Sequence, residues 1–296
     1  MSAIASLGGD EKLPPVAGFM FDVDGTLLLS DRSLGGYEVL PGAVETLAAL
    51  KDRGVPFVVL TNGSAFPPAE QAAKLRKIGL AVEDHQMLTP SSITADHMAR
   101  RGIKRVLVLG LRGVGHALDE AGIETTYTGE PRASEVDAVY VGWHPDGGMK
   151  DIEAACNAVW GGAKLFVASD VPFFVTKHGR TIGYSYTLTG AIRRLTKARA
   201  TLMGKPSLHA LKFVARKLGV PVREVGVVGD DPIVEMIMAR RGGATAFAVT
   251  TGMTKREDWM SQPERQRPHR ILADIREVLA WAPRPAEVHA PAPSDP

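Results

Sequence analysis

The sequence predicts an α/β fold with a parallel central sheet. Short, almost continuous apolar runs rich in β-branched residues recur along the chain, as in strands that are buried on both faces. Helical patterns lie between these runs, and strand, helix and strand joined by short connections is typical of parallel sheets. The predicted strands cover residues 16–22, 56–60, 105–109, 137–141, 164–168, 224–228 and 244–249.

Three of the intervening helices have recognisable ends. The helix predicted over 41–53 begins with a proline and is followed by a glycine, which matches the preferences of a first helical turn and of a helix end. The helices predicted over 67–78 and 207–218 also precede a glycine. In the last of them, apolar residues recur every three or four positions and define one buried face.

Length and composition limit the classes of protein. At about 150 residues per domain, 296 residues correspond to roughly two domains. Apolar residues make up 45% of the chain and charged residues 23%, so global disorder is excluded. The net charge of +2 is too small to indicate a nucleic acid or an anionic membrane as partner. With a single cysteine, Cys156, and no recognisable membrane span or secretory signal, we expect a cytoplasmic protein.

Polar residues follow three of the predicted strands, in the segments FDVDGT, LTNGS and VGDD. The carboxyl ends of parallel strands lie at one edge of the sheet, which is where ligands bind in such folds. If the three strands are neighbours, six polar side chains converge at that edge, namely Asp22, Asp24, Thr61, Asn62, Asp230 and Asp231.

The acidic members of this set indicate a site for Mg²⁺. Asp22, Asp24 and Asp230 offer carboxylate oxygens, which are the ligands that this hard ion prefers. A carboxylate attacks a phosphate dianion only when its charge is neutralised, and a metal that touches both groups achieves this. An aspartate nucleophile then forms an aspartyl-phosphate, while a second acid protonates the leaving oxygen and later activates water.

Two further segments supply groups that bind phosphate. Thr61, Asn62 and Gly63 offer a hydroxyl, an amide and a turn whose N–H groups suit phosphoryl oxygens. Lys205, in the segment GKP, adds a positive charge on a backbone that the following proline keeps extended. Each segment alone has a simpler interpretation as an ordinary turn or loop. Their order along the chain and their position after strands favour the functional interpretation.

Taken in order, these segments resemble the four motifs of the haloacid dehalogenase (HAD) superfamily. The motifs are FDVDGT at 21–26, LTN at 60–62, GKP at 204–206 and GDD at 229–231. Their spacing resembles that of subfamily IIA, which includes p-nitrophenyl, phosphoglycolate and nucleotide phosphatases, and the resemblance covers about residues 16–280. It implies a Mg²⁺-dependent phosphatase that acts on a small phosphorylated metabolite through an aspartyl-phosphate.

The resemblance also implies a role for each motif residue. Asp22 would be the nucleophile and a Mg²⁺ ligand, and Asp24 the general acid and base, whose backbone carbonyl also binds Mg²⁺. Thr61 and Lys205 would hold the phosphoryl group, and Asp230 would be the third protein ligand of the metal.

One acidic position departs from the family pattern, and a second acidic position adds to it. The family usually carries a further aspartate five residues after the metal-binding one, and here that position is Glu235, whose longer side chain accepts hydrogen bonds or holds a metal-bound water. Asp231 is an additional acid next to Asp230. We expect Asp231 and Glu235 to surround the metal ligands rather than to be ligands themselves.

The implied fold is a Rossmann-like core with an inserted α/β cap domain of the C2 type. The cap is expected to choose the substrate, with Asp170 and Arg180 of its loops as candidate binding residues. Residues 29–40 are expected to form an exposed loop rather than a cover for the site. The expected boundaries are 1–99 and 200–285 for the core, 100–199 for the cap and 286–296 for a disordered Pro/Ala-rich tail.

Other activities are compatible with the same motifs. A phosphotransferase or mutase uses the same core with a different acceptor in place of water. A non-catalytic protein that binds a phosphorylated metabolite is the alternative from another class, and the retained nucleophile Asp22 argues against it. A dehalogenase is disfavoured, because its chemistry needs no Mg²⁺ site. Neither the substrate nor the oligomeric state follows from the sequence, so a homodimer is left open.

Overall fold

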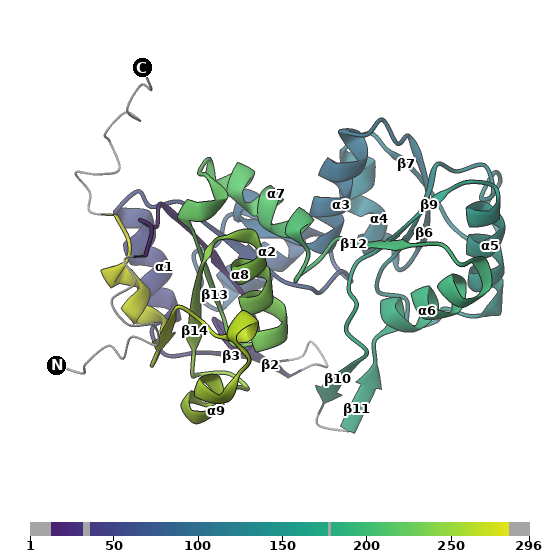
Figure 1. The fold of residues 1–296 in the computed structure, drawn as a ribbon. Helices are drawn as coiled ribbons and strands as arrows, with labels where there is room; N and C mark the ends of the chain where they lie inside the picture. The colour runs from purple at the N-terminus through teal and green to yellow at the C-terminus, as the bar shows by residue number, and fades with distance from the viewer. Residues whose placement is uncertain (1–12, 32–35, 177–178, 284–296) are drawn as a thin grey trace, which may run out of the picture.

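The computed structural model describes residues 13–31, 36–176 and 179–283. Its helices and strands form two α/β units, each built around a parallel sheet (Figure 1). The chain builds the first part of one unit, crosses into the other, and returns to complete the first. The predicted α/β fold with a parallel central sheet is therefore confirmed.

The first sheet has six parallel strands, and four of them lie within two residues of a predicted strand. The side chains along these strands are buried and apolar, which explains why continuous apolar runs in the sequence predicted the positions of the strands. The remaining two strands, at the edges, are too short to stand out in the sequence. In spatial order the strands are β15 (Arg270–Leu272), β14 (Thr245–Val249), β13 (Val225–Gly229), β1 (Gly18–Phe21), β4 (Phe57–Leu60) and β5 (Met87–Leu88).

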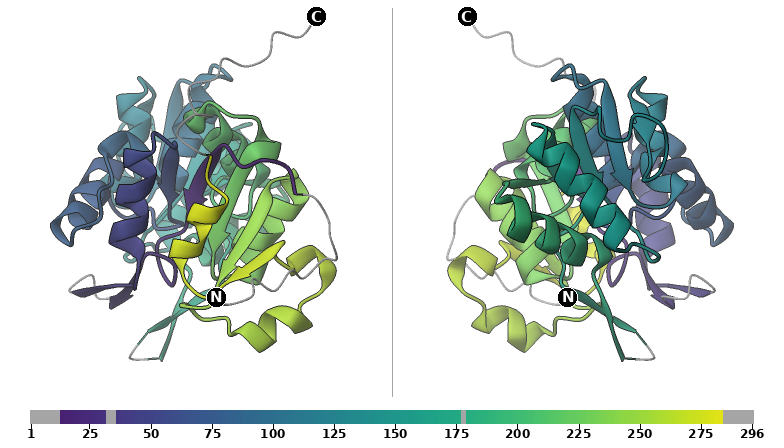
Figure 2. Two further views of the ribbon diagram at one scale, coloured as in Figure 1. Left: turned by 90° about the vertical axis from the view of Figure 1, so that its left-hand side faces the viewer. Right: turned by 90° about the vertical axis from the view of Figure 1, so that its right-hand side faces the viewer.

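Helices cover both faces of this sheet (Figure 2). One face packs against α1 (Ala43–Asp52), α2 (Pro68–Lys77) and the 3₁₀ segment η5 (Ile275–Ala280). The helices predicted over 41–53, 67–78 and 207–218 are all present within two residues at each end. The opposite face packs against α3 (Pro90–Ala99), α7 (Leu208–Leu218) and α8 (Ile237–Gly242).

The second sheet has five parallel strands and is also covered on both faces. Helices α5 (Met149–Trp160) and α6 (Tyr184–Thr196) pack on one face, and α4 (Arg112–Glu120) packs on the other. The sheet includes a strand at residues 200–202, so the second unit uses the chain up to residue 202. The predicted boundaries of 100–199 for the cap and 1–99 and 200–285 for the core stay a prediction. In spatial order its strands are β12 (Ala200–Leu202), β9 (Lys164–Val167), β8 (Ala138–Val141), β6 (Arg105–Leu109) and β7 (Glu124–Thr126).

Two antiparallel hairpins lie outside the sheets. They are formed by β2 (Leu28–Asp31) with β3 (Gly36–Val39), and by β10 (Phe173–Thr176) with β11 (Gly179–Ile182). Residues 29–40 therefore contain two paired strands where a loop was expected, while the side chains of Leu29 and Glu38 are exposed as expected. The hairpin forms because Leu28 is buried, and Tyr37 and Val39 pack against the core of the first unit.

A single hydrophobic cluster joins the two units. It extends from Leu60 in the first sheet through Ile93 and Met98 of α3 to Tyr140 and Phe166 in the second sheet. Tyr140 also exchanges a hydrogen bond of 3.2 Å with the hydroxyl of Ser91 in α3. Helix α3 is therefore packed between the two sheets and holds them against each other.

The remaining elements are short. Across the described residues, no helix is both long and apolar enough to cross a bilayer. The predicted tail at 286–296 lies outside the described residues. The short segments are α9 (Arg256–Ser261), η1 (Asp84–Gln86), η2 (Val222–Glu224), the π-helical turn η3 (Pro232–Met236) and η4 (Glu264–Gln266).

Candidate active site

The strand order brings the predicted site residues to one edge of the first sheet. Strand β1 lies between β13 and β4, and its last residue, Phe21, is in register with Val228 and Val59. The residues that follow these strands therefore share the carboxyl edge of the sheet. They are Asp22 after β1, Thr61 after β4 and Asp230 after β13.

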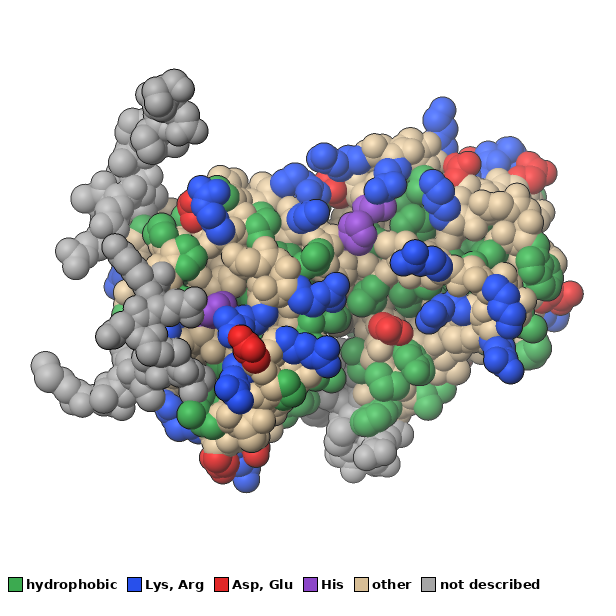
Figure 3. Space-filling model, in the orientation of Figure 1, with side chains coloured by type: hydrophobic (Ala, Val, Ile, Leu, Met, Phe, Trp, Pro, Cys, Tyr) green, Lys and Arg blue, Asp and Glu red, His purple; other side chains and the backbone are tan. Residues whose placement is uncertain are grey.

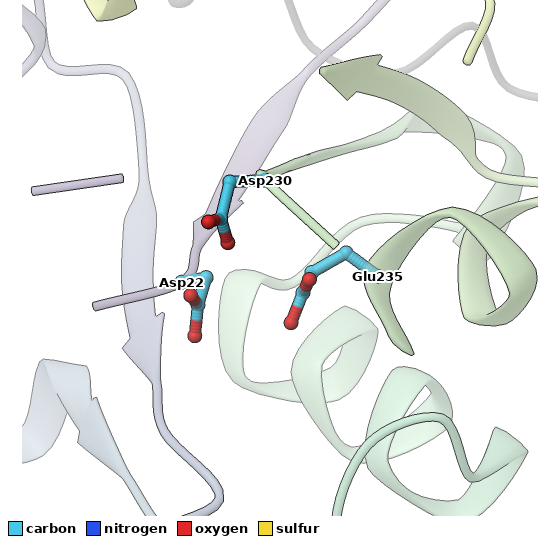
Figure 4. Close-up of side chains that lie close together, drawn as sticks. All are labelled: Asp22, Asp230 and Glu235. Atoms are coloured by element: carbon cyan, nitrogen blue, oxygen red, sulfur yellow. The ribbon is translucent and has the colours of Figure 1, made fainter. Parts of the chain in front are cut away.

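Three carboxylates meet at this edge. Asp22, Asp230 and Glu235 each place an oxygen within 4.8 Å of the others. Their side chains gather around a common space (Figure 4). All three residues are buried. The structure thus brings together two of the predicted metal ligands with an acid that was expected only to surround them.

Glu235 reaches this position through the π-helical turn η3. In this turn the N–H of Met236 donates to the carbonyl of Asp231 at 3.4 Å, which spans one residue more than an α-helical turn. The Asp231 carboxylate caps the turn by accepting a hydrogen bond of 2.8 Å from the N–H of Ile233. Asp231 therefore holds the turn that carries Glu235, and nothing in the residue pattern indicated this wider geometry.

Lys205 is the cation of the cluster. Its side chain is 2% exposed, and its ammonium group donates to Asp22 Oδ1 and lies 2.7 Å from Glu235 Oε1. The amide of Asn62 holds the backbone of Lys205 in both directions, donating to its carbonyl at 2.9 Å and accepting from its N–H at 2.8 Å. Asn62 thus positions Lys205, and its predicted contact with substrate stays a prediction.

The electrostatics of the cluster follow from its burial. Burial raises the pKa of Asp22, Asp230 and Glu235 to about 7, although the charge of Lys205 works in the opposite direction. Burial also acts to lower the pKa of Lys205, but the facing carboxylates of Asp22 and Glu235 outweigh it and raise that pKa. One ammonium group therefore does not compensate three buried carboxylates.

A divalent cation fits this donor set. With all three acids ionised, the cluster of three carboxylates and one ammonium group carries two uncompensated negative charges. In addition, Glu235 Oε2 is buried without a hydrogen-bond partner among the described residues. An unpaired buried oxygen is costly, and a cation bound by hard oxygen ligands removes that cost.

Two other predicted residues lie close to the cluster. The Thr61 hydroxyl accepts a hydrogen bond of 3.0 Å from the N–H of Gly63, so the threonine and the turn that follows it form one local structure. Asp24 lies in the turn between β1 and β2, and its negative charge contributes to the raised pKa of Asp22. Their predicted roles toward phosphate and proton transfer stay predictions.

The segment after β14 holds the Asp230 carboxylate and was not predicted as part of the site. The N–H of Met253 donates to Asp230 Oδ2 at 2.9 Å, and the Thr254 hydroxyl donates to the Asp230 carbonyl at 2.7 Å. A Cβ on Gly252 would lie 2.0 Å from Asp230 Oδ2, so only glycine permits this approach. The available signal was the polar run that follows the predicted strand 244–249.

We expect Gly252→Ala to impair the site without unfolding the protein. The added methyl group must displace the Asp230 carboxylate, and a misplacement of about 1 Å costs on the order of 10²-fold in rate. The kcat/KM for an aryl phosphate and the Mg²⁺ concentration for half-maximal activity measure the effect. Gly190→Ala is the matched control, since nothing lies within 4 Å of the added methyl group in α6. Equal kinetics of the two variants would show that the close approach is unimportant.

The second unit lies beside this site. The N–H of Trp143, after β8, donates to the Ser64 hydroxyl at 3.1 Å, and the carbonyl of Ala168, after β9, accepts from Gly204 at 3.0 Å. Asp170 follows shortly after Ala168 and is exposed. The side chain of Arg180, the other predicted binding residue of this unit, lies outside the described residues.

Comparisons with known proteins agree with this geometry. Residues 19–124 match the family described as "Haloacid dehalogenase-like hydrolase", and residues 202–278 match a second family described as "HAD-hydrolase-like". These two ranges contain Asp22 and Asp24 in the first case, and Lys205, Asp230 and Glu235 in the second.

Three individual proteins illustrate the similarity. The chain is 30% identical to the 5'-nucleotidase YutF of Bacillus subtilis over 249 residues, which cover 84% of this chain and 92% of that protein. It is 26% identical to the sugar-phosphatase AraL of the same organism, over 90% of this chain and 93% of that protein. The crystal structure of a 4-nitrophenylphosphatase from Thermotoga maritima superposes with a TM-score of 0.78 at 26% identity, covering 90% of this chain and 97% of that one.

Proposed function

The chain belongs to the haloacid dehalogenase-like hydrolases, and from this membership we propose that it is a phosphatase of a small phosphorylated metabolite. The observation that carries the proposal is the buried pair of Asp22 and Lys205 at the carboxyl edge of the sheet, next to Asp230 and Glu235. A nucleophile needs a fixed orientation, and Lys205 supplies it. Phosphoryl transfer depends mainly on positioning and charge neutralisation, which these four residues provide together.

We propose Mg²⁺ as the metal, held by the carboxylates of Asp22 and Asp230 and by the backbone carbonyl of Asp24. The unpaired Oε2 of Glu235 supports a hydrated cation in this cluster, because it would accept a hydrogen bond from a water carried by the ion. When bound, the ion neutralises the phosphate charge and aligns it with the nucleophile. Glu235 would balance the remaining charge and keep Lys205 in place, while Asp231 maintains the turn that carries Glu235.

The residues of the chain then account for both half-reactions. A carboxylate oxygen of Asp22 forms a bond to phosphorus while the bond from phosphorus to the leaving oxygen breaks, and Asp24 supplies the proton that this oxygen needs. In the second half, Asp24 takes a proton from water, whose oxygen displaces Asp22 from phosphorus. Lys205 and Thr61 would hold the phosphoryl oxygens throughout, and the buried position of Lys205 gives its charge a strong effect there.

We assign the choice of substrate to the second unit. Its segments after β8 and β9 lie against the loops that follow β4 and precede Lys205. Asp170 therefore stays a candidate for contacting the organic part of the substrate. The relatives named above are a nucleotidase and a sugar phosphatase, which supports a phosphomonoester of a small metabolite without selecting one.

Hydrolysis of p-nitrophenyl phosphate by metal-stripped protein tests the proposal. Addition of Mg²⁺ is expected to increase turnover by about 10³-fold or more, because the ion removes several kcal/mol of charge repulsion in the transition state. It is also expected to raise the melting temperature, since saturation at 100 times Kd adds about 2.7 kcal/mol to the free energy of unfolding.

Asp230→Asn and Asp231→Asn form a matched pair for this experiment. The two variants carry the same chemical change at adjacent positions, and only Asp230 belongs to the acidic cluster. We expect Asp230→Asn to lose both the activity and the melting-temperature response to Mg²⁺, and Asp231→Asn to retain most of both. Metal-independent turnover by the wild type, or an equal loss in both variants, would contradict the metal site.

A further inference from the structure

A groove runs along the boundary between the two units, away from the acidic cluster. It consists of two adjoining cavities of about 450 Å³ and about 270 Å³. The cavities share His97 and Arg101 from the end of α3 and the segment just after it, and His209 from the start of α7. The smaller cavity extends onto the second sheet, where β9 and β12 line it. None of the residues of the acidic cluster lines either cavity.

The groove is strongly basic. Its only acidic lining residue within the described ranges is Asp96, which forms an ion pair of 2.5 Å with Arg216. Among the described residues, no acidic side chain forms an ion pair with any of the other five basic residues of the groove. The six lysines and arginines that line it are Arg100, Arg101, Lys164, Arg199, Lys212 and Arg216.

The groove concentrates positive charge, whereas the chain as a whole has a net charge of only +2. Figure 3 shows lysine and arginine side chains gathered around histidines on the face where α3 and α7 meet β12. The basic residues come from both units, because Arg101 and Lys212 belong to the first and Lys164 to the second. Like charges brought together in this way repel one another unless an anion lies between them.

The centre of the groove is aromatic. The rings of His97 and His209 pack edge to face with centroids 4.6 Å apart, and His97 also contacts the ring of Phe166. Burial and the positive charge of nearby residues lower the pKa of both histidines, to about 4 for His97. The two rings are therefore neutral at pH 7 and offer hydrogen-bonding groups between the cations.

We propose that this groove is a second binding site, which takes a linear oligophosphate anion and bridges the two units. A single phosphate is too small to reach cations on both sides of two adjoining cavities, whereas a chain of phosphates follows the groove and contacts several of them. The combined size of the cavities is in the range of small-molecule sites. Arginine and lysine are the residues that bind phosphate oxygens through charge-assisted hydrogen bonds.

Titration calorimetry of the full chain with inorganic tripolyphosphate, in EDTA and without substrate, tests this site independently of turnover. Under these conditions the uncompensated carboxylates of the acidic cluster repel the anion, so the groove is the expected site. We expect saturable binding of one anion per chain. Lys212→Ala and Lys164→Ala are each expected to weaken it by about tenfold, because each removes a charge-assisted contact from a different unit.

Lys150→Ala is the matched control, since it removes the same charge from an exposed position of α5. It is expected to leave the affinity within about twofold of the wild type, because Lys150 does not line the groove. Comparison of the affinities for pyrophosphate and ATP distinguishes a bare phosphate chain from a nucleotide as the ligand, because only ATP carries a base and a ribose that add contacts. Absence of saturable binding, or equal weakening by Lys150→Ala and Lys212→Ala, would overturn the proposal. The proposal would also be overturned if only one of the variants Lys212→Ala and Lys164→Ala weakened binding of the anion, since the anion would then not bridge the two units.

Discussion

Asp22→Asn is expected to lower kcat for p-nitrophenyl phosphate by about 10⁴-fold or more, because an amide oxygen does not serve as the nucleophile. The fold is expected to remain intact. Burial raises the pKa of Asp22 to about 7, which means that this negative charge destabilises the folded protein. A neutral side chain of the same shape removes that destabilisation, so the melting temperature of the metal-free variant should equal or exceed that of the wild type.

Asp231→Asn serves again as the control for Asp22→Asn, because it places the same change in the same site without touching the proposed nucleophile. Trapping of a covalent phosphoenzyme by rapid acid quench tests directly for the aspartyl-phosphate. We expect labelling of the wild type and of Asp231→Asn, and none of Asp22→Asn. Substantial turnover or labelling of Asp22→Asn would refute the assignment of the nucleophile.

Lys205→Met is expected to abolish activity and, unlike Asp22→Asn, to destabilise the fold. The substitution keeps most of the length of the side chain but leaves Asp22 and Glu235 buried without their shared cation. Removal of one partner from a buried ion pair typically costs about 3–5 kcal/mol of the free energy of unfolding. Denaturation of the metal-free protein by urea measures this cost.

Two further variants identify the cause of the destabilisation. Lys51→Met removes the same charge from an ion pair with Glu83 that is about half exposed on both sides, and it should have little effect. The double variant Lys205→Met/Glu235→Gln is expected to be more stable than Lys205→Met alone, because it removes one of the stranded carboxylates. If all three variants are equally stable, the cluster does not depend on Lys205 for charge compensation.

The sequence was most informative where residues are buried on both sides. The strands around Phe21, Val59 and Val228 have to be apolar along their whole length, so their positions were readable, and the polar residues that follow them marked the site edge. The motif that contains Lys205 was recognised by its order among the others. Its distance of 183 residues from Asp22 along the chain gave no indication of their contact.

Features that depend on backbone geometry or on long-range packing were not readable. The π-helical turn that brings Glu235 next to Asp22 and Asp230 leaves no recognisable pattern in its residues, so the sequence did not indicate how close these three carboxylates lie. The close approach of Gly252 to Asp230 joins two separate loops, and glycine is common in loops and turns that have no contact of this kind. The strands β2 and β3 do not stand out in the sequence because they are short and partly polar, so the pattern predicts a loop over 29–40.

Helix α3 bears on how the molecule unfolds and how it can be engineered. Because Ile93 and Met98 contribute to one apolar cluster with residues of both sheets, each unit shares part of its hydrophobic interior with the other, in addition to a cluster of its own. Excision of the second unit would expose part of this interior to water and favour aggregation of the remainder. The two units are therefore expected to melt in a single cooperative transition, and a change of substrate preference is better sought in the exposed loops around Asp170 than by domain exchange.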